Sequence, residues 1–371
     1  MPPRLGKESR GLHPGPPSPS QSPCSRGSAC RARASLAGGR ASRYPTRRAA
    51  PGAVTWNRIG MSALICGSLA YDTIMVFPDQ FKNHILPDKV HILNVSFLVP
   101  RMRREFGGCA GNIAYNLKLI GGDPIPMATV GQDFAPYRAH FEKHGIRLDQ
   151  VRVIDDMFTP QAFITTDLDN NQLTAFHPGA MSRSHDNHVR DVEGVTFGIV
   201  APDGREGMLQ NAQEFHDCGI PFIFDPGQAM PLFSGEEFRH FIELADFVVV
   251  NDYESNLLQE RTGWDEQTIA SKVRAYITTR GPRGSQIHVD GQVHEIPPAR
   301  ERDVVDPTGC GDAYRAGLIL GLMRGYDLPT CGRMASLMGA LKVGHAGTQN
   351  QFFTYDEFAA EFREQFGYAL G

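Results

Sequence analysis

The segment Asp306-Pro-Thr-Gly-Cys-Gly-Asp312 combines residue types that suit phosphate chemistry. Val304 and Val305 indicate the end of a strand, which Asp306-Pro307 breaks, and the glycines allow a tight turn. The mostly apolar run that starts at Asp312 predicts a buried helix. A helix that starts with small residues leaves its first N–H groups uncovered at the positive end of the helix dipole. The segment therefore predicts an anion site, with phosphate as the usual occupant.

Asp312 would lie beside that anion, although phosphate repels a carboxylate. A role as general base, which takes a proton from an attacking hydroxyl, explains the position. The alternative is that Asp312 only stabilises the start of its own helix and that the glycines only make the turn. The segment alone leaves both interpretations open.

Further polar or glycine-rich segments follow short apolar runs, and they start at Gly67, Phe106, Asp225, Asn251 and Thr278. In open α/β sheets, ligands bind at the carboxyl ends of the strands. Each segment alone is also explained as an ordinary turn. Their shared placement at the ends of expected strands favours a single ligand site.

The elements that would position these residues alternate between short apolar strands and helical sequence. We expect strands at 63–67, 126–131, 196–201, 221–225 and 247–251. Near-continuous apolar strands between helices are typical of a parallel sheet covered on both faces. Two regions, at about 73–106 and 160–178, show strand-like alternation without helices. They predict a small separate β-sheet that acts as a lid and excludes water from the site.

The composition is that of a globular protein, with 41% hydrophobic and 21% charged residues in 371. No apolar run approaches the roughly 20 residues that span a bilayer, so we expect no membrane partner. The seven cysteines are scattered and form no C-x-x-C pair. This pattern argues against a disulfide framework or a zinc site and predicts a reducing, cytoplasmic location.

Residues 1–60 form a basic leader with eleven Lys or Arg and one acid, a charge of +10. The whole chain carries −4, so the remainder carries −14. The leader is rich in Pro, Gly and Ser and is expected to be disordered. Three interpretations of the leader compete: a nucleic-acid-binding arm, a transit peptide, or translated sequence upstream of a true start at Met61. We favour the start at Met61, and the acidic remainder argues against nucleic acid as a partner.

Three segments resemble motifs of the ribokinase-like (PfkB) carbohydrate kinases: Asp306 to Asp312, Gly107-Gly108 to Asn112, and Asn251-Asp-Tyr-Glu254. The resemblance covers 61–371 and none of the leader. It implies an α/β fold with a parallel sheet in three layers and a small β-sheet lid. It also implies an ATP-dependent phosphotransferase with an alcohol acceptor, which uses ATP and Mg²⁺ and leaves dependence on a monovalent cation open. No G-x-x-x-x-G-K-[ST] segment is present, which excludes a P-loop kinase.

The resemblance assigns roles to individual residues. It makes Asp312 the catalytic base and gives the anion hole to the amides of Gly309, Cys310 and Gly311. The substrate-binding residues are expected to be Ser68, Asp72, Gly107, Gly108 and Asn112. The nucleotide-binding residues are expected to be Asn251, Thr279, Gly281 and Gly284, with Glu254 holding Mg²⁺ through water.

Within the family, several segments are similar to bacterial adenosine kinases: Gly67 to Met75, Ser96 to Val99, Phe176 to Met181, Asn251 to Glu254 and Gly347-Thr-Gln349. This similarity implies that adenosine is phosphorylated on its 5′-hydroxyl to AMP, as in purine salvage. An aromatic slot for the base would then be needed.

Phe163 and Phe176 on the lid are candidates to stack on that base, and Gln228 is a candidate to read its edge. Packing within the lid explains both phenylalanines equally well.

Three alternatives remain open on the sequence. The enzyme could phosphorylate ribose or another sugar, or a different nucleoside such as inosine. The fold could also serve a regulator that binds a small ligand without catalysis. In each case the exposed edge of the lid allows a homodimer.

Overall fold

The computed structural model describes residues 61–85, 94–169, 171–300 and 303–371, so the basic leader lies outside the described residues. Within these ranges a nine-stranded sheet has the order β13-β12-β11-β10-β9-β8-β1-β4-β5. The strand pairs from β11 to β5 are parallel, whereas β12 and β13 add antiparallel strands at one edge. The bounds are β1 Ser62–Cys66, β4 Asp123–Gly131, β5 Val151–Ile154, β8 Val195–Val200, β9 Phe222–Phe224, β10 Phe247–Asn251, β11 Ala275–Thr279, β12 Ser285–Val289 and β13 Gln292–Ile296.

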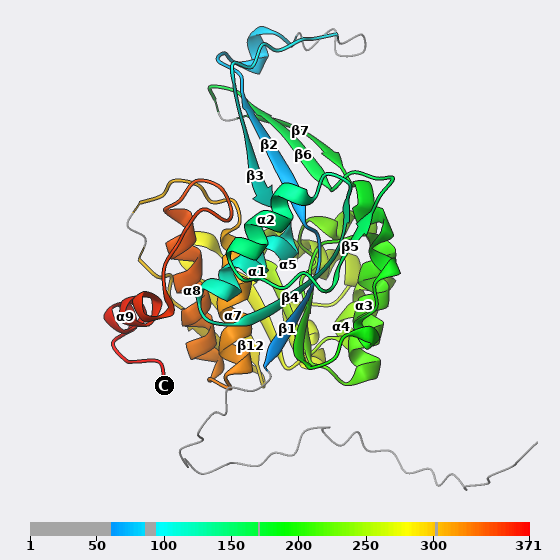
Figure 1. Cartoon of the computed structure of the whole chain (residues 1–371). Coiled ribbons are helices and arrows are strands. Elements are labelled where there is room, and N and C mark those ends of the chain that lie inside the picture. Colours follow the sequence, from blue (N-terminus) through cyan, green and yellow to red (C-terminus); the bar gives the residue numbers. More distant parts are fainter. Residues whose placement is uncertain (1–60, 86–93, 170, 301–302) are drawn as a thin grey trace, which may run out of the picture. The chain divides into compact units, whose positions relative to one another are not determined.

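Helices cover both faces of this sheet (Figure 1). Side chains of β1 alternate between the two sides, with Ala63 and Ile65 in one apolar core and Leu64 and Cys66 in the other. The first core includes α1, α2, α7 and α8, and the second includes α3 and α4, so the three-layer α/β prediction is confirmed. The helices are α1 Cys109–Leu119, α2 Ala135–Lys143, α3 Arg205–Cys218, α4 Gly235–Leu244, α5 Asp252–Thr262, α6 Glu266–Lys272, α7 Cys310–Met323, α8 Leu328–Val343 and α9 Tyr355–Phe366.

The predicted lid is a second, four-stranded sheet with the order β3-β2-β6-β7 (Figure 1). Its strands are β2 Ala70–Val76, β3 Arg101–Gly107, β6 Gln161–Thr166 and β7 Gln172–His177. β2 follows β1 after a short turn, and β3 leads through Gly108 directly into α1. The lid is thus continuous in the chain with β1 and α1 of the main body, and predicted substrate-binding residues lie at both junctions.

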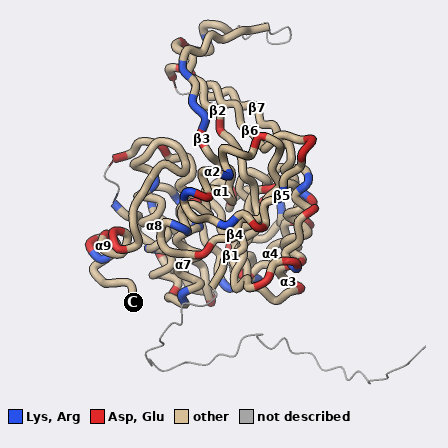
Figure 2. Tube along the Cα trace, viewed as in Figure 1, with Lys and Arg blue, Asp and Glu red and all other residues tan. Residues whose placement is uncertain are grey.

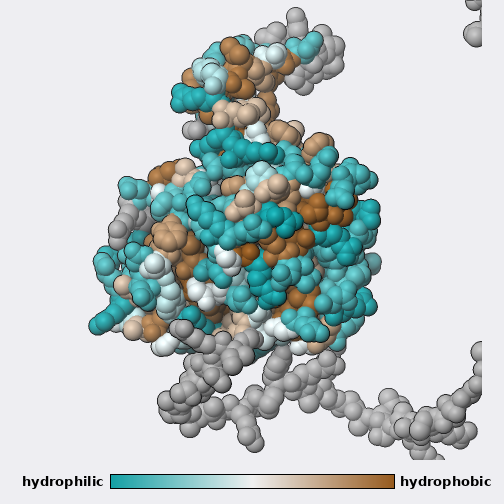
Figure 3. Space-filling view, in the orientation of Figure 1, coloured by the Kyte–Doolittle hydropathy of each residue, from teal (hydrophilic) through white to brown (hydrophobic). Residues whose placement is uncertain are grey.

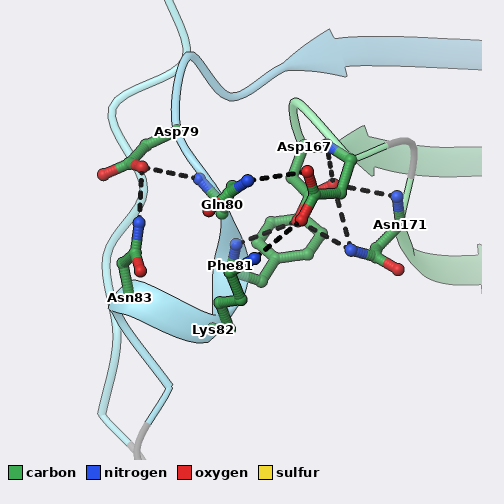
Figure 4. A network of polar contacts seen from close by, with 8 residues as sticks. Asp79, Gln80, Phe81, Lys82, Asn83, Asp167 and Asn171 are labelled. Atoms are coloured by element: carbon green, nitrogen blue, oxygen red, sulfur yellow. Dashed lines mark hydrogen bonds and ion pairs between the residues drawn. The ribbon is translucent and has the colours of Figure 1, made fainter.

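A network of polar contacts ties the β6–β7 turn of the lid to the loop after β2 (Figure 4). Asp167 accepts the backbone N–H groups of Phe81 and Asn171 at 2.9 and 2.8 Å. Asp79 accepts the N–H of Gln80 at 2.7 Å and the side-chain amide of Asn83 at 2.9 Å. These carboxylates satisfy turn donors that no strand neighbour reaches, and so they fix the outer end of the lid.

The surface of the lid is partly apolar and partly basic. All of β7 is exposed, and Leu98 and Met102 are 83% and 70% exposed. Apolar side chains gather toward the outer part of the lid in Figure 3, and basic residues follow β3 in Figure 2. A homodimer through this surface stays a prediction.

Two sequence expectations need correction. Val304 and Val305 do not end a strand, because the N–H groups of Val305 and Asp306 both donate to the carbonyl of Val343 at the end of α8. Helix α7 begins at Cys310, two residues before the expected start, and Asp312 lies in its first turn, as predicted. Within the ranges given above, no helix is both long and apolar enough to cross a membrane.

Candidate active site

Four strands deliver polar residues to one edge of the central sheet. Because β1, β8, β9, β10 and β11 are parallel, their carboxyl ends meet at the same edge. Ser68 follows β1, Asp225 follows β9, and Asn251 and Thr279 end β10 and β11. Asn251 and Thr279 are direct partners in the register. The sheet therefore gathers segments that lie far apart in the sequence.

The predicted anion site lies at the start of α7. Gly309 precedes the helix with φ +79°, and a Cβ there would lie 3.0 Å from Thr348 Cγ2, so glycine is required. The Cys310 N–H donates to the carbonyl of Pro307 at 3.1 Å and is occupied in this conformation. The N–H groups of Gly309 and Gly311 donate to no atom of the described chain. These two amides are therefore the open donors for an anion.

Asp312 lies at this site, half-buried, and accepts a hydrogen bond from Asn112 Nδ2 of α1 at 2.8 Å. Burial raises the pKa of Asp312 to about 7, and the carboxylates of Asp225 and Asp72 act in the same direction. The hydrogen bond from Asn112 and the charge of Arg315 partly offset the rise. A carboxylate with a pKa near the working pH suits a general base.

Arg315 and Asp225 form an ion pair behind the anion site that sequence reasoning did not assign. Arg315 Nε and Nη2 donate to the two carboxylate oxygens of Asp225 at 2.7 and 2.8 Å, and both side chains are almost fully buried. A Cβ on Gly311 would lie 2.8 Å from Arg315 Nη1, which places the guanidinium beside the open amides. A lone arginine within the apolar sequence of α7 was the available signal.

The predicted substrate side lies where the lid joins α1. A Cβ on Gly107 would lie 2.4 Å from Asp72 Oδ2, and one on Gly108, with φ +85°, would lie 2.5 Å from the Ser68 carbonyl. Burial and the neighbouring Glu105 raise the pKa of Asp72 to about 6. Gly107 thus makes room for the Asp72 carboxylate, and Gly108 lets the turn after β1 lie close to the start of α1.

Ser68 connects the turn after β1 to the start of α1. Its Oγ accepts the Cys109 N–H at 3.3 Å, and its carbonyl accepts the Ala110 N–H at 3.0 Å. Ser68 therefore has a structural task at this turn, and its contact with substrate stays a prediction.

The lid register separates the two phenylalanines predicted to stack on a base. Phe176 pairs with Ala162, which pairs with Asp72, so these three share one face of the lid sheet. Phe163 pairs instead with Thr73 and lies on the opposite face. A substrate bound to Asp72 would therefore face Phe176 rather than Phe163, and contact of either phenylalanine with a base stays a prediction. Gln228 is exposed in the turn after Asp225.

Comparison with known proteins identifies the family. Residues 71–354 match the pfkB family carbohydrate kinases. The chain belongs to the PfkB family. It is accordingly an ATP-dependent phosphotransferase that acts on a hydroxyl group.

The relatives of this PfkB kinase include named nucleoside kinases. The nucleoside kinase of Methanocaldococcus jannaschii is 31% identical over 270 residues, which is 71% of this chain and 87% of the relative. The structure of Burkholderia thailandensis nucleoside kinase in complex with inosine is 52% identical, covers 83% of this chain and 99% of its own, and has a TM-score of 0.76. A Thermotoga maritima ribokinase, at 19% identity and a TM-score of 0.69, shares the fold. The ribokinase-like fold is confirmed. The first two relatives are nucleoside kinases, a broader class than the adenosine kinases that the sequence segments suggested.

The residues predicted to hold the nucleotide and Mg²⁺ lie on β10, β11 and the turns after them. Asn251 Oδ1 accepts the Glu254 N–H, and Glu254 Oε2 accepts the Asn251 N–H, both at 2.8 Å. Glu254 Oε1 accepts no hydrogen bond from the described part of the PfkB kinase, and burial raises the pKa of Glu254. In the described ranges no group of three His, Cys, Asp or Glu could hold a metal. One open carboxylate oxygen fits Mg²⁺ that is held mainly by water and substrate phosphates.

The turn after β11 is built around two glycines. Gly281 has φ +55° and Gly284 has φ +81°, and a Cβ on Gly284 would lie 2.1 Å from the Ile296 carbonyl. This close approach fixes the turn beside Thr279, whose Oγ1 donates to the Val250 carbonyl at 3.4 Å. Their contact with the nucleotide stays a prediction.

Lys342 is a second buried charge that the sequence reasoning did not assign. Its ammonium donates to the carbonyls of Asp306 and His345 at 2.8 and 3.0 Å, and its side chain is fully buried. Asp306 in turn accepts the N–H of Gly347 at 2.9 Å. Together these contacts join the turn before α7 to the segment after α8.

Proposed function

We propose that this enzyme transfers the γ-phosphate of ATP to the 5′-hydroxyl of a purine nucleoside. The observation that carries the chemistry is the pair of Asn112 and Asp312 beside the open amides of Gly309 and Gly311. The substrate class is supported by the relatives named nucleoside kinases and by the inosine bound to the Burkholderia thailandensis relative.

In this proposal the ribose binds where the lid meets α1. Asp72, the Gly107-Gly108 turn and Asn112 orient the sugar hydroxyls, and the lid excludes water. Asp312 takes the proton of the 5′-hydroxyl as its oxygen attacks the γ-phosphorus. The open amides of Gly309 and Gly311 and the dipole of α7 stabilise the negative charge on the transferring group.

Charge around the transferring group is also set by buried side chains. Arg315 supplies positive charge beside Gly311 while Asp225 holds it in place. Glu254, with Asn251 as its backbone partner, would hold Mg²⁺ through water. When bound, the metal neutralises phosphate oxygens and so lowers the barrier for nucleophilic attack.

Inosine and adenosine are the two substrates that specific observations favour. Inosine is supported by the relative that is 52% identical, and adenosine by the sequence segments that are similar to adenosine kinases. A role in purine salvage follows for either substrate. Phe176 would stack on the base from the Asp72 face of the lid.

A coupled assay for ADP, with ATP and Mg²⁺ and with inosine, adenosine, ribose or fructose as acceptor, tests the proposal. We expect kcat/KM to be highest for a nucleoside and its product to be the 5′-monophosphate. Asp312→Asn should lower kcat by about 10²- to 10⁴-fold with nearly unchanged nucleoside affinity. Higher kcat/KM for ribose or fructose would replace the proposal with a sugar kinase, and no turnover with tight binding would favour a non-catalytic regulator.

A further inference from the structure

A chain of hydrogen bonds leads from Asp312 away from the anion site. Asn112 Nδ2 donates to Asp312 Oδ2 at 2.8 Å, and Asn112 Oδ1 accepts from Gln349 Nε2 at 3.0 Å. Gln349 Oε1 lies 3.0 Å from His140 Nε2. These hydrogen bonds connect three parts of the fold: α1, the segment between α8 and α9, and α2. Asn112 and Gln349 are 5% and 3% exposed, so water cannot substitute for these bonds.

The direction of each bond follows from the carboxylate at the end of the chain. An ionised Asp312 only accepts, so Asn112 must present its Nδ2–H and turn its Oδ1 toward Gln349. Gln349 must then present Nε2, which leaves its Oε1 to accept from His140. The same orientation of the Asn112 amide thus satisfies Asp312 on one side and, on the other, Gln349 and His140, which do not hydrogen-bond to Asp312.

His140 is held rigidly at the far end of the chain. Its ring stacks on Phe106 with centroids 4.2 Å apart and on Tyr115 with centroids 5.7 Å apart. Burial and the neighbouring His144 and Lys143 lower the pKa of His140 to about 4. His140 is therefore neutral near pH 7, and the tautomer with its proton on Nε2 supplies the donor that Gln349 Oε1 needs.

A second bond from the same amide reaches the substrate side. Gln349 Nε2 also donates to the hydroxyl of Tyr137 at 2.7 Å, and that hydroxyl donates to the Gly107 carbonyl at 2.8 Å. Gln349 thus contacts both the partner of Asp312 and the partner of the glycine turn. One amide group therefore links the Asn112–Asp312 pair to the turn at Gly107 and Gly108.

We propose that Gln349 and His140 are positioning residues that hold Asn112 against Asp312 Oδ2 and so select Oδ1 as the atom that receives the substrate proton. Oδ1 accepts no hydrogen bond from the described residues, whereas Oδ2 is occupied by Asn112. The proton passes from the substrate hydroxyl to Oδ1 while the new O–P bond forms and the bond to the departing ADP breaks. This inference rests on the proposed function, because it assigns Asp312 the role of base.

The test is the pH dependence of kcat for Gln349→Met, which keeps side-chain volume but cannot donate to Asn112. A freely rotating Asn112 amide stabilises the ionised carboxylate less, so the acid limb should move to higher pH by about one unit. Activity at pH 7 should fall several-fold. Other groups that face Asp312, namely Asp72, Asp225, Arg315 and Cys109, make no hydrogen bond to Gln349. Tyr137 loses the hydrogen bond from Gln349 in this variant but keeps its own bond to the Gly107 carbonyl.

Gln351→Met is the matched control, because Gln351 is equally buried and donates at 2.8 Å to Asn116 Oδ1, which does not contact Asp312. It should destabilise the fold to a similar degree and leave the acid limb in place. His140→Phe, which keeps the stacked ring, should move the limb in the same direction as Gln349→Met, and His144→Phe should not.

Superimposable profiles for Gln349→Met and Gln351→Met would overturn the inference. If Gln349→Met does not fold, the pair His140→Phe and His144→Phe decides by the same criterion. Each profile is measured with whichever acceptor the unmodified enzyme phosphorylates. Failure of nucleoside turnover in the unmodified enzyme is therefore distinct from failure of the positioning role.

Discussion

The guanidinium of Arg315 and the carboxylate of Asp225 form two parallel hydrogen bonds, 2.7 and 2.8 Å long, although the residues are 90 positions apart. Their pair connects the first turns of α7 to the end of β9 directly behind the open amides. A buried pair of this kind stabilises a particular geometry more than it stabilises the fold, because both charges lose their hydration.

Arg315→Met should therefore lower the free energy of unfolding by about 3–5 kcal/mol, since it leaves Asp225 buried and unpaired. Urea unfolding measures the change. Arg283→Met is the matched control, because it breaks an exposed pair with Asp252 whose side chains are 66% and 53% exposed. That control should cost only about 0–1 kcal/mol, and equal losses in both variants would contradict the structural role of Arg315.

The pH dependence of kcat/KM should report two carboxyl groups of the free enzyme. Burial raises the pKa of Asp312 to about 7 and that of Asp72 to about 6, and the proposed mechanism needs both ionised. The value of kcat/KM should be maximal above both pKa values. It should fall as Asp312 is protonated below about pH 7, and fall more steeply as Asp72 is also protonated below about pH 6. Asp72→Asn should retain only the transition near pH 7. If kcat/KM of the unmodified enzyme does not change between pH 5 and 8, Asp312 is ruled out as the base.

The register of the lid distinguishes Phe176 from Phe163 in nucleoside binding. Phe176→Ala should raise the KM for the nucleoside about tenfold, because stacking on a base contributes roughly 1–3 kcal/mol. Phe163→Ala removes an equally large ring from the opposite face and should leave that KM nearly unchanged. Steady-state kinetics with inosine and adenosine provide the comparison. A larger effect from Phe163→Ala would mean that the nucleoside binds on the other face of the lid.

Gly108→Ala should impair both stability and activity severely. A methyl group there combines φ +85° with a contact of 2.5 Å to the Ser68 carbonyl, so the lid junction must shift. Gly121→Ala has nearly the same backbone strain, φ +80°, but meets nothing within 4 Å and should cost only about 1–2 kcal/mol. Thermal unfolding and kcat/KM separate the two effects, and equal losses would show that backbone strain alone is responsible.

Much of the fold was predictable because it rests on local patterns. The apolar strands at 63–67 and 247–251 and the alternating strands of the lid follow directly from side-chain periodicity. The edge strands β12 and β13 were not predicted, since each is only five residues long and neither forms a continuous apolar run like those of the central strands. Val304 and Val305 were misassigned because a tertiary contact with Val343 decides their conformation.

The site was predictable where a motif carries its own chemistry, and less so where contacts are long-range. Asp312 and its flanking glycines follow from helix-terminus physics, which is local. Gln349, Arg315 and Lys342 were not assigned because their importance depends on partners that only the folded chain brings close. Phe163 and Phe176 could not be told apart for a related reason, since the face on which a strand residue lies depends on the pairing register.

The contact between Asn112 and Asp312 spans 200 positions, and that between Gln349 and Asn112 spans 237. Contacts of such high sequence separation close a long loop of the chain, which costs conformational entropy. During synthesis, α1 leaves the ribosome long before α7 and cannot form the site alone. Catalytic competence therefore marks completed folding, and a nucleoside that bridges α1 and α7 should stabilise the whole domain rather than one half of it.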